Sequence, residues 1–396
     1  MSKILNRSLV LGLIQLTNLL VPVLAIPIIL GRAGEEVYSK YAVWITFSQF
    51  SIIFLDLGYS IFGVQTCSKN DCRKAIDQTI TTSTIMKVLA SIAIMLAASI
   101  FSFVNELDIV NGVIVTGYTL FASIQPLFYF LATGRLKVQL YAVIISKSFF
   151  IISLFLLPNI TLQMLLSCLM ASSIISFYVT LNIWRPFVSV KSFSVENLRS
   201  ALPFMSSRIS IAALMQGSIL LMFSVTSVEA FAYIAFADQL YRIAISATTP
   251  ITQVLLPAMA QGMKLREYFM LNFIILLFLI ISVTLVLSNL DYIVSMIGFK
   301  QSIGSFVGIH DAFLVYGFLV VINFLSRTFG YPLHINGEAM RKINHINILG
   351  LLLYAIIIGA CYFCFRIDFM IVLFAFLVAE ISILSLRVFL FWESYR

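Results

Sequence analysis

The sequence predicts an all-α membrane protein with about twelve transmembrane helices. Its 396 residues are 61% hydrophobic and only 11% charged, whereas roughly 25% of the residues of an ordinary soluble domain are charged. The mean hydropathy of the chain is +1.04. A soluble fold of this size would have too few polar residues to cover its surface, so we expect the lipid bilayer to surround the chain.

Twelve segments reach the length of ~20 mostly apolar residues that a helix needs to cross a bilayer. They are residues 9–30, 41–62, 79–103, 111–133, 138–157, 163–183, 202–225, 230–256, 268–288, 311–332, 344–364 and 369–390. The first segment is too long for the apolar core of a cleaved signal peptide. We therefore expect it to be the first spanning helix, with kinks at Pro22 and Pro27.

Positive charge alternates between successive loops, and this alternation predicts the orientation. With the N-terminus inside, fifteen Lys and Arg residues lie on the inner side and four on the outer side. The inner ones are Lys3, Arg7, Lys69, Arg73, Lys74, Arg135, Lys137, Arg185, Lys191, Arg199, Lys264, Arg266, Arg341, Lys342 and Arg396. The outer ones are Arg32, Lys40, Lys300 and Arg366. Such an excess marks the cytoplasmic side, so both termini are expected in the cytoplasm.

The longest inner link lies mid-chain and divides the helices into two sets of six. The predicted parts are an N-terminal bundle (1–184), a cytoplasmic linker (185–201) and a C-terminal bundle (202–396). Ser194 is a candidate N-cap for a short interfacial helix that starts near Glu196. Many transporters consist of two such halves.

No enzyme, metal or cofactor motif stands out. The sequence has no Walker A loop, no H-E-x-x-H pattern and no Gly-rich dinucleotide fingerprint, and His310, His334 and His345 are scattered. Cys67 and Cys72 fall in a predicted cytoplasmic loop, where thiols stay reduced, and Cys361 and Cys364 are expected to be small core residues. We predict neither an enzyme nor a cofactor. The net charge of +8 belongs to the cytoplasmic loops and does not indicate nucleic-acid binding.

Charged residues inside the apolar segments are the main functional candidates. Each costs about 2.5–3.5 kcal/mol at the centre of a membrane helix, so each suggests a function. The cations are Lys87, Lys147, Arg208, Arg242 and Arg327, and the acids are Asp56, Asp238 and Glu380. Because the cations outnumber the acids, a hydrated interior lined by them would suit an anionic substrate such as a phosphate or pyrophosphate. The acids are candidates for coupling to an ion.

Structural interpretations compete with these functional ones. Arg208 and Arg327 lie near helix ends, where their side chains could extend to the cytoplasmic head groups. Arg242 follows Asp238 by four residues, so the two could form a pair on one helix face. Glu380 could pair with any of the cations. Lys87 and Lys147 have no acid within one turn, which favours a functional role for them.

A set of short motifs resembles the polysaccharide flippase family, and in particular its Wzx-type O-antigen translocases. The motifs of the first half are Gln15-x-x-Asn18, Pro22, Pro27, Ile29-Leu30-Gly31, Tyr41 and Asp56-Leu57-Gly58-Tyr59. Those of the second half are Leu202-Pro203-Phe204, Tyr233-x-x-Phe236-Ala237, Thr249-Pro250 and Leu256-Pro257-Ala258-Met259. Their order and spacing cover most of the chain, and the wider superfamily includes lipid II flippases and MATE-type multidrug exporters.

The resemblance implies two six-helix bundles around a central cavity that opens alternately to each side. It implies that the substrate is undecaprenyl pyrophosphate carrying an O-antigen repeat unit, moved across the inner membrane of a Gram-negative bacterium. An O-antigen polymerase and a chain-length regulator are further expected partners. The five cations fit the cationic lumen of this family, although their positions come from charge and not from a residue-by-residue alignment.

Two alternatives stay open. A small-molecule exporter of the same superfamily would be expected to carry acids in its cavity, which the excess of cations opposes. A membrane-bound O-antigen polymerase would be expected to have a large outer loop with catalytic residues. The longest outer loop, residues 289–310, is short and offers only Asp291, Lys300 and His310.

Overall fold

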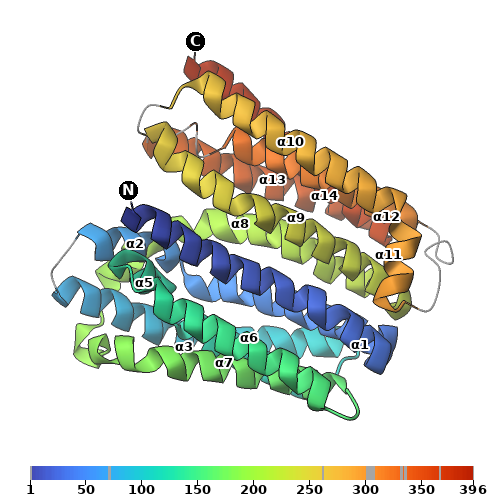
Figure 1. Cartoon of the computed structure of the whole chain (residues 1–396), viewed down its shortest axis with the longest axis horizontal. Helices are drawn as coiled ribbons and strands as arrows, with labels where there is room; N and C mark the ends of the chain where they lie inside the picture. The colour runs from blue at the N-terminus through green and yellow to red at the C-terminus, as the bar shows by residue number, and fades with distance from the viewer. Residues whose placement is uncertain are drawn as a thin grey trace. The chain divides into compact units, whose positions relative to one another are not determined.

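The described part of the chain is helical throughout. The computed structural model describes residues 2–69, 73–260, 263–299, 308–330, 333, 337–364 and 367–395 (Figure 1). Every regular element in these ranges is a helix, which confirms the all-α prediction. The residues of the sequence analysis that lie outside the described ranges are Cys72, Lys300, His334, Arg366 and Arg396.

The elements follow one another along the chain, and the connections that the structure describes in full are short. They are α1 (Ser2–Asp56), α2 (Tyr59–Lys69), α3 (Arg73–Val104), α4 (Ile109–Ile124), α5 (Leu127–Thr133), α6 (Leu136–Leu156), α7 (Leu162–Trp184), η1 (Arg185–Phe187), η2 (Val190–Ser192), α8 (Val195–Val225), α9 (Val228–Ala260), α10 (Leu265–Ser288), α11 (Leu290–Ile297), α12 (Ile309–Thr328), α13 (Gly337–Cys364) and α14 (Phe369–Tyr395).

The helices account for the predicted spans. Within the described residues, ten helical segments are long and apolar enough to cross a membrane. One of them, Val10–Asp56, is 47 residues long and covers most of the first two predicted spans. The eighth predicted span falls on α9, which has 33 residues. Length and composition therefore indicate a multi-pass membrane protein, and the number twelve follows when α1 is counted as two spans and α9 is added to the ten segments.

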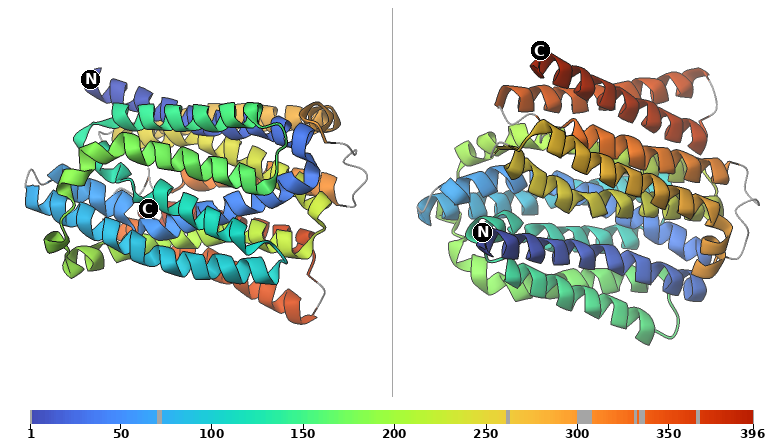
Figure 2. Two further views of the ribbon diagram at one scale, coloured as in Figure 1. Left: turned by 90° about the horizontal axis from the view of Figure 1, so that it is seen from below. Right: turned by 45° about the horizontal axis from the view of Figure 1, so that its top comes forward.

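The chain divides into two compact units, Met1–Ala212 and Ala213–Arg396, with the boundary inside α8. In each unit the long helices run side by side (Figures 1 and 2). In the first unit, α1 packs on α3, α4, α6 and α7, and α4 packs on α7. In the second unit, α12 packs on α9, α10 and α14. The predicted division at a cytoplasmic linker stays a prediction.

The link between the predicted halves differs from the expected one. The hydroxyl of Ser194 accepts a hydrogen bond from the backbone N–H of Asn197 at 3.3 Å, which confirms the predicted N-cap. However, the helix that follows is not a separate short one, because α8 continues unbroken to Val225. Pro203 lies inside α8. A proline removes one helical hydrogen bond, and here that loss does not end the helix.

The first two predicted spans also differ, because α1 runs through both. Pro22 and Pro27 lie inside α1 without ending it. The helix changes direction instead at Gly34, where φ is 86° and ψ is 175°. Only glycine adopts this conformation readily. The predicted outer loop is therefore reduced to a kink at one residue.

A tight corner joins α1 to α2 directly after Asp56. Leu57 and Gly58 both have positive φ angles, 50° and 82°. A Cβ atom on Gly58 would lie 2.4 Å from the carbonyl oxygen of Ala201 and 3.0 Å from the amide nitrogen of Met205. Glycine is thus required both for the backbone conformation and for the close approach to α8. This corner fixes the position of Asp56 against α8.

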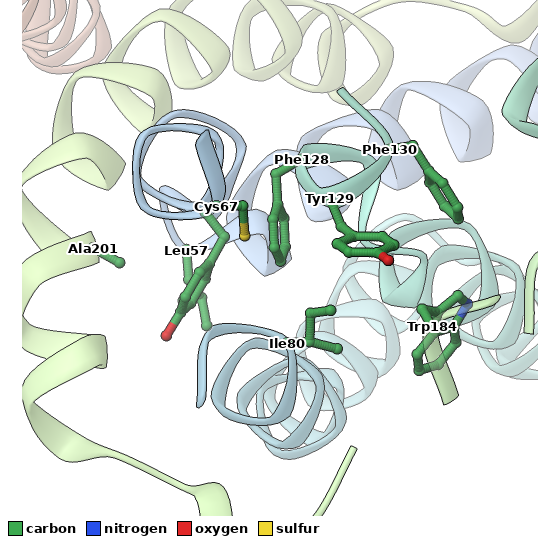
Figure 3. Packing of buried hydrophobic residues seen from close by; sticks show 9 residues of the cluster. Leu57, Cys67, Ile80, Phe128, Tyr129, Phe130, Trp184 and Ala201 are labelled. Atoms are coloured by element: carbon green, nitrogen blue, oxygen red, sulfur yellow. The ribbon is translucent and has the colours of Figure 1, made fainter. Parts of the chain in front are cut away.

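A buried apolar cluster holds the corner in place (Figure 3). It brings together side chains from α2, α3, α5, the end of α7 and α8. Its members are Leu57, Tyr59, Cys67, Ile80, Phe128, Tyr129, Phe130, Trp184 and Ala201. The burial of these aromatic and aliphatic side chains against one another gives the corner extensive van der Waals contact.

We predict that Gly58→Ala destabilises the protein. The positive φ alone should cost about 1–2 kcal/mol, and the clash with the backbone of α8 adds to that cost. Gly31→Ala is the matched control, because a Cβ atom there would meet nothing within 4 Å. The thermal midpoints of the purified variants in one detergent test the prediction. Equal midpoints for the two variants would contradict it.

Candidate functional site

The eight charged residues predicted from the sequence fall into three groups. Asp56, Lys87 and Arg208 lie together in the first unit; Asp238, Arg242, Arg327 and Glu380 lie together in the second unit; and Lys147 lies apart from both groups in the first unit. The roles of these residues in transport stay predictions. Their contacts show which charges are already balanced within the protein.

The first group is centred on an ion pair between α1 and α8. The Nη1 atom of Arg208 lies 2.5 Å from the Oδ2 atom of Asp56, and the two side chains are 35% and 19% exposed. Arg208 also donates to the hydroxyl of Ser60, while the amide of Ser60 donates to the Asp56 carboxylate at 3.2 Å. Asp56 therefore caps α2 and binds Arg208 at the same time. The partner of Arg208 is a carboxylate of this chain.

Lys87 is a buried member of the same group. It is 2% exposed, and its ammonium donates to the carbonyl oxygen of Ser123 at 2.7 Å. This oxygen lacks its usual helical partner, because the amide of Leu127 donates instead to Gln125 at the break before α5. A cation at a helix C-terminus is favoured by the helix dipole. Lys87 thus stabilises the end of α4, and it also interacts electrostatically with Asp56 and Arg208.

The second group begins with the predicted pair on α9. The Nε atom of Arg242 lies 2.5 Å from the Oδ2 atom of Asp238, and the side chains are 14% and 8% exposed. The predicted pairing on one helix face is therefore confirmed. Tyr241 and Tyr316 interact electrostatically with both members of this pair.

Glu380 forms the other centre of the second group. Its carboxylate is buried, is hydrogen-bonded by Asn323 and interacts with Arg327 and Arg387. Arg327 in turn donates to the carbonyl of Ile245 on α9 at 3.3 Å. The group therefore links α9, α12 and α14. With Arg387, which also interacts with Glu380, the group has three cations and two acids among the described residues.

Arg387 was missed by the sequence analysis. It is 7% exposed, and its guanidinium donates to the carbonyl of Ser326 at 2.7 Å and to the side-chain oxygen of Asn347 at 2.8 Å. Its position near the inner end of the last span made it look like part of the cytoplasmic end of the chain. Its spacing of seven residues from Glu380 puts both on one helix face, and this spacing was the available signal.

Lys147 differs from the other cations. It lies on α6, is half-buried, and forms no hydrogen bond or ion pair with the residues that the structure describes. Val143, one turn earlier on the same face of α6, packs in a small cluster with Val10 and Ile14 of α1. Lys147 therefore lies one turn beyond Val143, on the side of α6 that faces α1.

Cysteine and metal chemistry give no alternative site in the described residues. Cys364 is exposed at the end of α13 and Cys361 is half-buried, so the prediction that both are core residues is wrong. The end of a helix leaves fewer neighbours to cover a side chain. No group of three or more His, Cys, Asp or Glu side chains with metal-binding geometry occurs in the described ranges.

The sequence comparison identifies the family. The family described as polysaccharide biosynthesis protein matches residues 4–263, well over half of the chain. The chain belongs to this polysaccharide biosynthesis protein family. No curated protein matches the chain significantly in sequence.

Solved structures share the fold of this family member at low identity. A multidrug resistance MATE transporter of the MOP superfamily in an inward-facing conformation superimposes with a TM-score of 0.68 at 14% identity, over 95% of this chain and 97% of the transporter. The lipid II flippase MurJ in an inward closed conformation gives 0.71 at 14%, over 97% and 87%. A MOP superfamily transporter from Pyrococcus furiosus gives 0.66 at 11%, over 99% and 94%. The predicted MATE-like fold is confirmed.

We predict energetic coupling between Asp56 and Arg208. Asp56→Asn and Arg208→Gln should each destabilise the protein, and the double variant should be more stable than the sum of the two losses implies. The expected coupling lies within the ~0.5–3 kcal/mol found for residues in direct contact. Thermal midpoints of the parent, the two single variants and the double variant measure it.

The matched control for this cycle is Glu36 and Lys40, an exposed pair 2.6 Å apart on one helix. Such pairs contribute only about 0.3–0.5 kcal/mol. Coupling of Asp56 and Arg208 no larger than that of the control pair would show that the α1–α8 ion pair does not hold the corner.

We predict different stability effects at the two lysines. Lys87→Met should cost about 1–3 kcal/mol, because it leaves the Ser123 carbonyl unpaired in a buried position. Lys147→Met should change stability by less than about 0.5 kcal/mol, since the lysine makes no such contact. Thermal midpoints in one detergent compare them. The distinction fails if both variants lose the same stability.

Proposed function

We propose that the protein is a flippase for undecaprenyl-pyrophosphate-linked O-antigen repeat units. It would carry them from the cytoplasmic to the periplasmic leaflet of a bacterial inner membrane by alternating access. The membership in the polysaccharide biosynthesis protein family is the observation that carries this proposal. The likeness to MurJ adds only the fold.

The surplus of buried positive charge supports an anionic substrate. The first charged group contains two cations and one acid, and the second contains three cations and two acids. A net positive charge in an apolar environment favours the binding of an anion, and the hydrogen bonds of Lys87 and Arg387 to backbone carbonyls offset only part of its cost. A pyrophosphate supplies such an anion and accepts several charge-assisted hydrogen bonds.

Lys147 is the first residue to test, because its ammonium is not already engaged. We predict that Lys147→Gln lowers the flux of a lipid-linked glycan into liposomes by about 10–100-fold, the loss expected for one hydrogen bond between charged groups. Lys147→Arg should retain part of the flux. Because Lys147 makes no hydrogen bond or ion pair with the described residues, its variants should fold like the parent.

Lys74→Gln is the matched control, since Lys74 is an exposed lysine near the start of α3. It should transport at the parent rate. Parent-like flux of Lys147→Gln would remove Lys147 from the site. Absence of glycan flux in the parent itself would contradict the proposed substrate.

A second candidate function is the export of small molecules. The observation that favours this function is the similarity in fold to a multidrug resistance MATE transporter. The two functions differ in a simple experiment. Deleting the gene of a flippase abolishes surface polysaccharide, whereas deleting the gene of an exporter raises sensitivity to drugs and leaves the polysaccharide intact.

A further inference from the structure

The linker that follows α7 is fastened along α3 by three threonines. Thr79, Thr81 and Thr82 are fully buried, and their hydroxyls hydrogen-bond the linker at distances of 3.0–3.1 Å. Their partners are the carbonyl of Phe187, the amides of Ser189 and Ser194, and the side chain of Asn197. The linker therefore follows α3 over residues 187–197.

This attachment lies at the depth where the apolar spans begin and end. The predicted span of α3 starts at residue 79, the span before the linker ends at residue 183, and the span after it starts at residue 202. Together these three boundaries put residues 185–199 at the interface between membrane and water, on the predicted cytoplasmic side.

The linker exposes a compact group of apolar side chains. Val190 is 80% exposed, Val195 is 54% exposed and Phe193 is 38% exposed. Single apolar residues on a surface are ordinary, but several close together indicate contact with a membrane or another protein. The linker therefore offers an apolar contact surface at the depth of the lipid head groups.

Positive charge accompanies these apolar side chains. Arg185, Lys191 and Arg199 are exposed, and residues 185–199 contain a single acid besides these three cations. Arg73 of α3 adds a fourth cation, because its guanidinium lies over the ring of Phe187, 5.8 Å from the centroid. We define the linker surface as the exposed side chains Arg185, Val190, Lys191, Phe193, Val195 and Arg199. This surface is both apolar and cationic.

We propose that the linker surface binds anionic phospholipids of the inner leaflet. Its cations pair with the lipid phosphates, and its apolar side chains enter the boundary between head groups and acyl chains. A soluble anion would leave the apolar side chains uncovered, and a zwitterionic lipid would leave the cations without a net counter-charge. The proposal goes beyond the flippase function and does not depend on the transported substrate.

The position of the linker favours lipid as strongly as its charge does. Lipid surrounds a multi-pass protein at the depth of its span ends, so head groups of the inner leaflet lie within reach of the linker. The attraction of each Lys or Arg to an anionic leaflet falls off within a Debye length, and the linker lies within that distance. The linker is then held by α3 on one side and by lipid on the other.

The helix α11 offers an internal control, because it exposes apolar side chains without cations. Tyr292 is 69% exposed and Met296 is 76% exposed. The helix contains Asp291 and neither Lys nor Arg. Lipid that meets α11 therefore does so without attraction between opposite charges.

Photo-crosslinking of the full-length protein tests the proposal. The probes are phosphatidylglycerol and phosphatidylcholine with the same diazirine at the head-group end of one acyl chain. Each is added in trace amounts to protein in phosphatidylcholine nanodiscs, and mass spectrometry gives the ratio of labelling by the two probes for each segment. We expect this ratio to be about fivefold higher at residues 185–199 than at α11. High ionic strength should remove the difference, because salt screens exposed charges.

Two pairs of exposed basic residues provide matched variants. Lys191→Gln combined with Arg199→Gln removes two cations of the linker surface and should lower the linker ratio to that of α11. Lys264→Gln combined with Arg266→Gln removes two exposed cations at the start of α10 and should leave the linker ratio unchanged. All four side chains are exposed, so both variants should fold like the parent. The ionic-strength measurement on the parent decides the question if one of them does not.

Each outcome supports or overturns the proposal. A raised linker ratio that salt and the Lys191 and Arg199 variant both remove supports it. Absence of linker labelling by both probes overturns it and indicates that a protein or a second copy of the chain covers the surface. Equal ratios at the linker and α11, or equal losses in the two variant pairs, overturn it as well. Glycan flux is not part of these measurements, so the proposed function is tested separately.

Discussion

Backbone carbonyl groups at helix ends impose the constraint on which the rest of the structure depends. Inside a bilayer no water replaces a lost helical hydrogen bond, so each free carbonyl needs a donor from the protein. Three long cationic side chains provide such donors. Lys87 binds the carbonyl of Ser123 at the end of α4, Arg32 binds that of Leu154 at the end of α6 at 2.7 Å, and Arg387 binds that of Ser326 at the end of α12.

This constraint changes how the buried charges are understood. A cation at a helix C-terminus is stabilised by the hydrogen bond and by the helix dipole together, so its presence does not require a substrate. Arg208 and Arg242 have carboxylate partners instead. The interpretation of all five predicted cations as free binding groups is therefore too simple. Lys147 is the member of that set for which neither kind of partner occurs in the described residues.

The fold could be predicted well from the sequence, because a bilayer requires each spanning helix to have a certain length and an apolar composition. Length and hydropathy located the spans, and the four-residue spacing of Asp238 and Arg242 predicted their pairing. The contacts of Asp56 with Arg208 and of Lys87 with Ser123 were not predictable, because they join residues 152 and 36 positions apart. The close approach of the α1–α2 corner to α8 at Gly58 brings the first pair together. Arg387 escaped notice because a cation near a span end resembles a loop charge.

The same reasoning singles out Lys147 as the cation that an anionic substrate could engage without breaking a hydrogen bond or ion pair inside the described part of the protein. A single unbalanced charge in a low-dielectric region is stabilised most by a counter-ion that can be desolvated with it. A soluble anion would have to leave water for this environment. An anion attached to a prenyl chain gains apolar contact when it enters, which offsets part of that desolvation. A cation such as Lys147 therefore suits a lipid-linked pyrophosphate better than a free one.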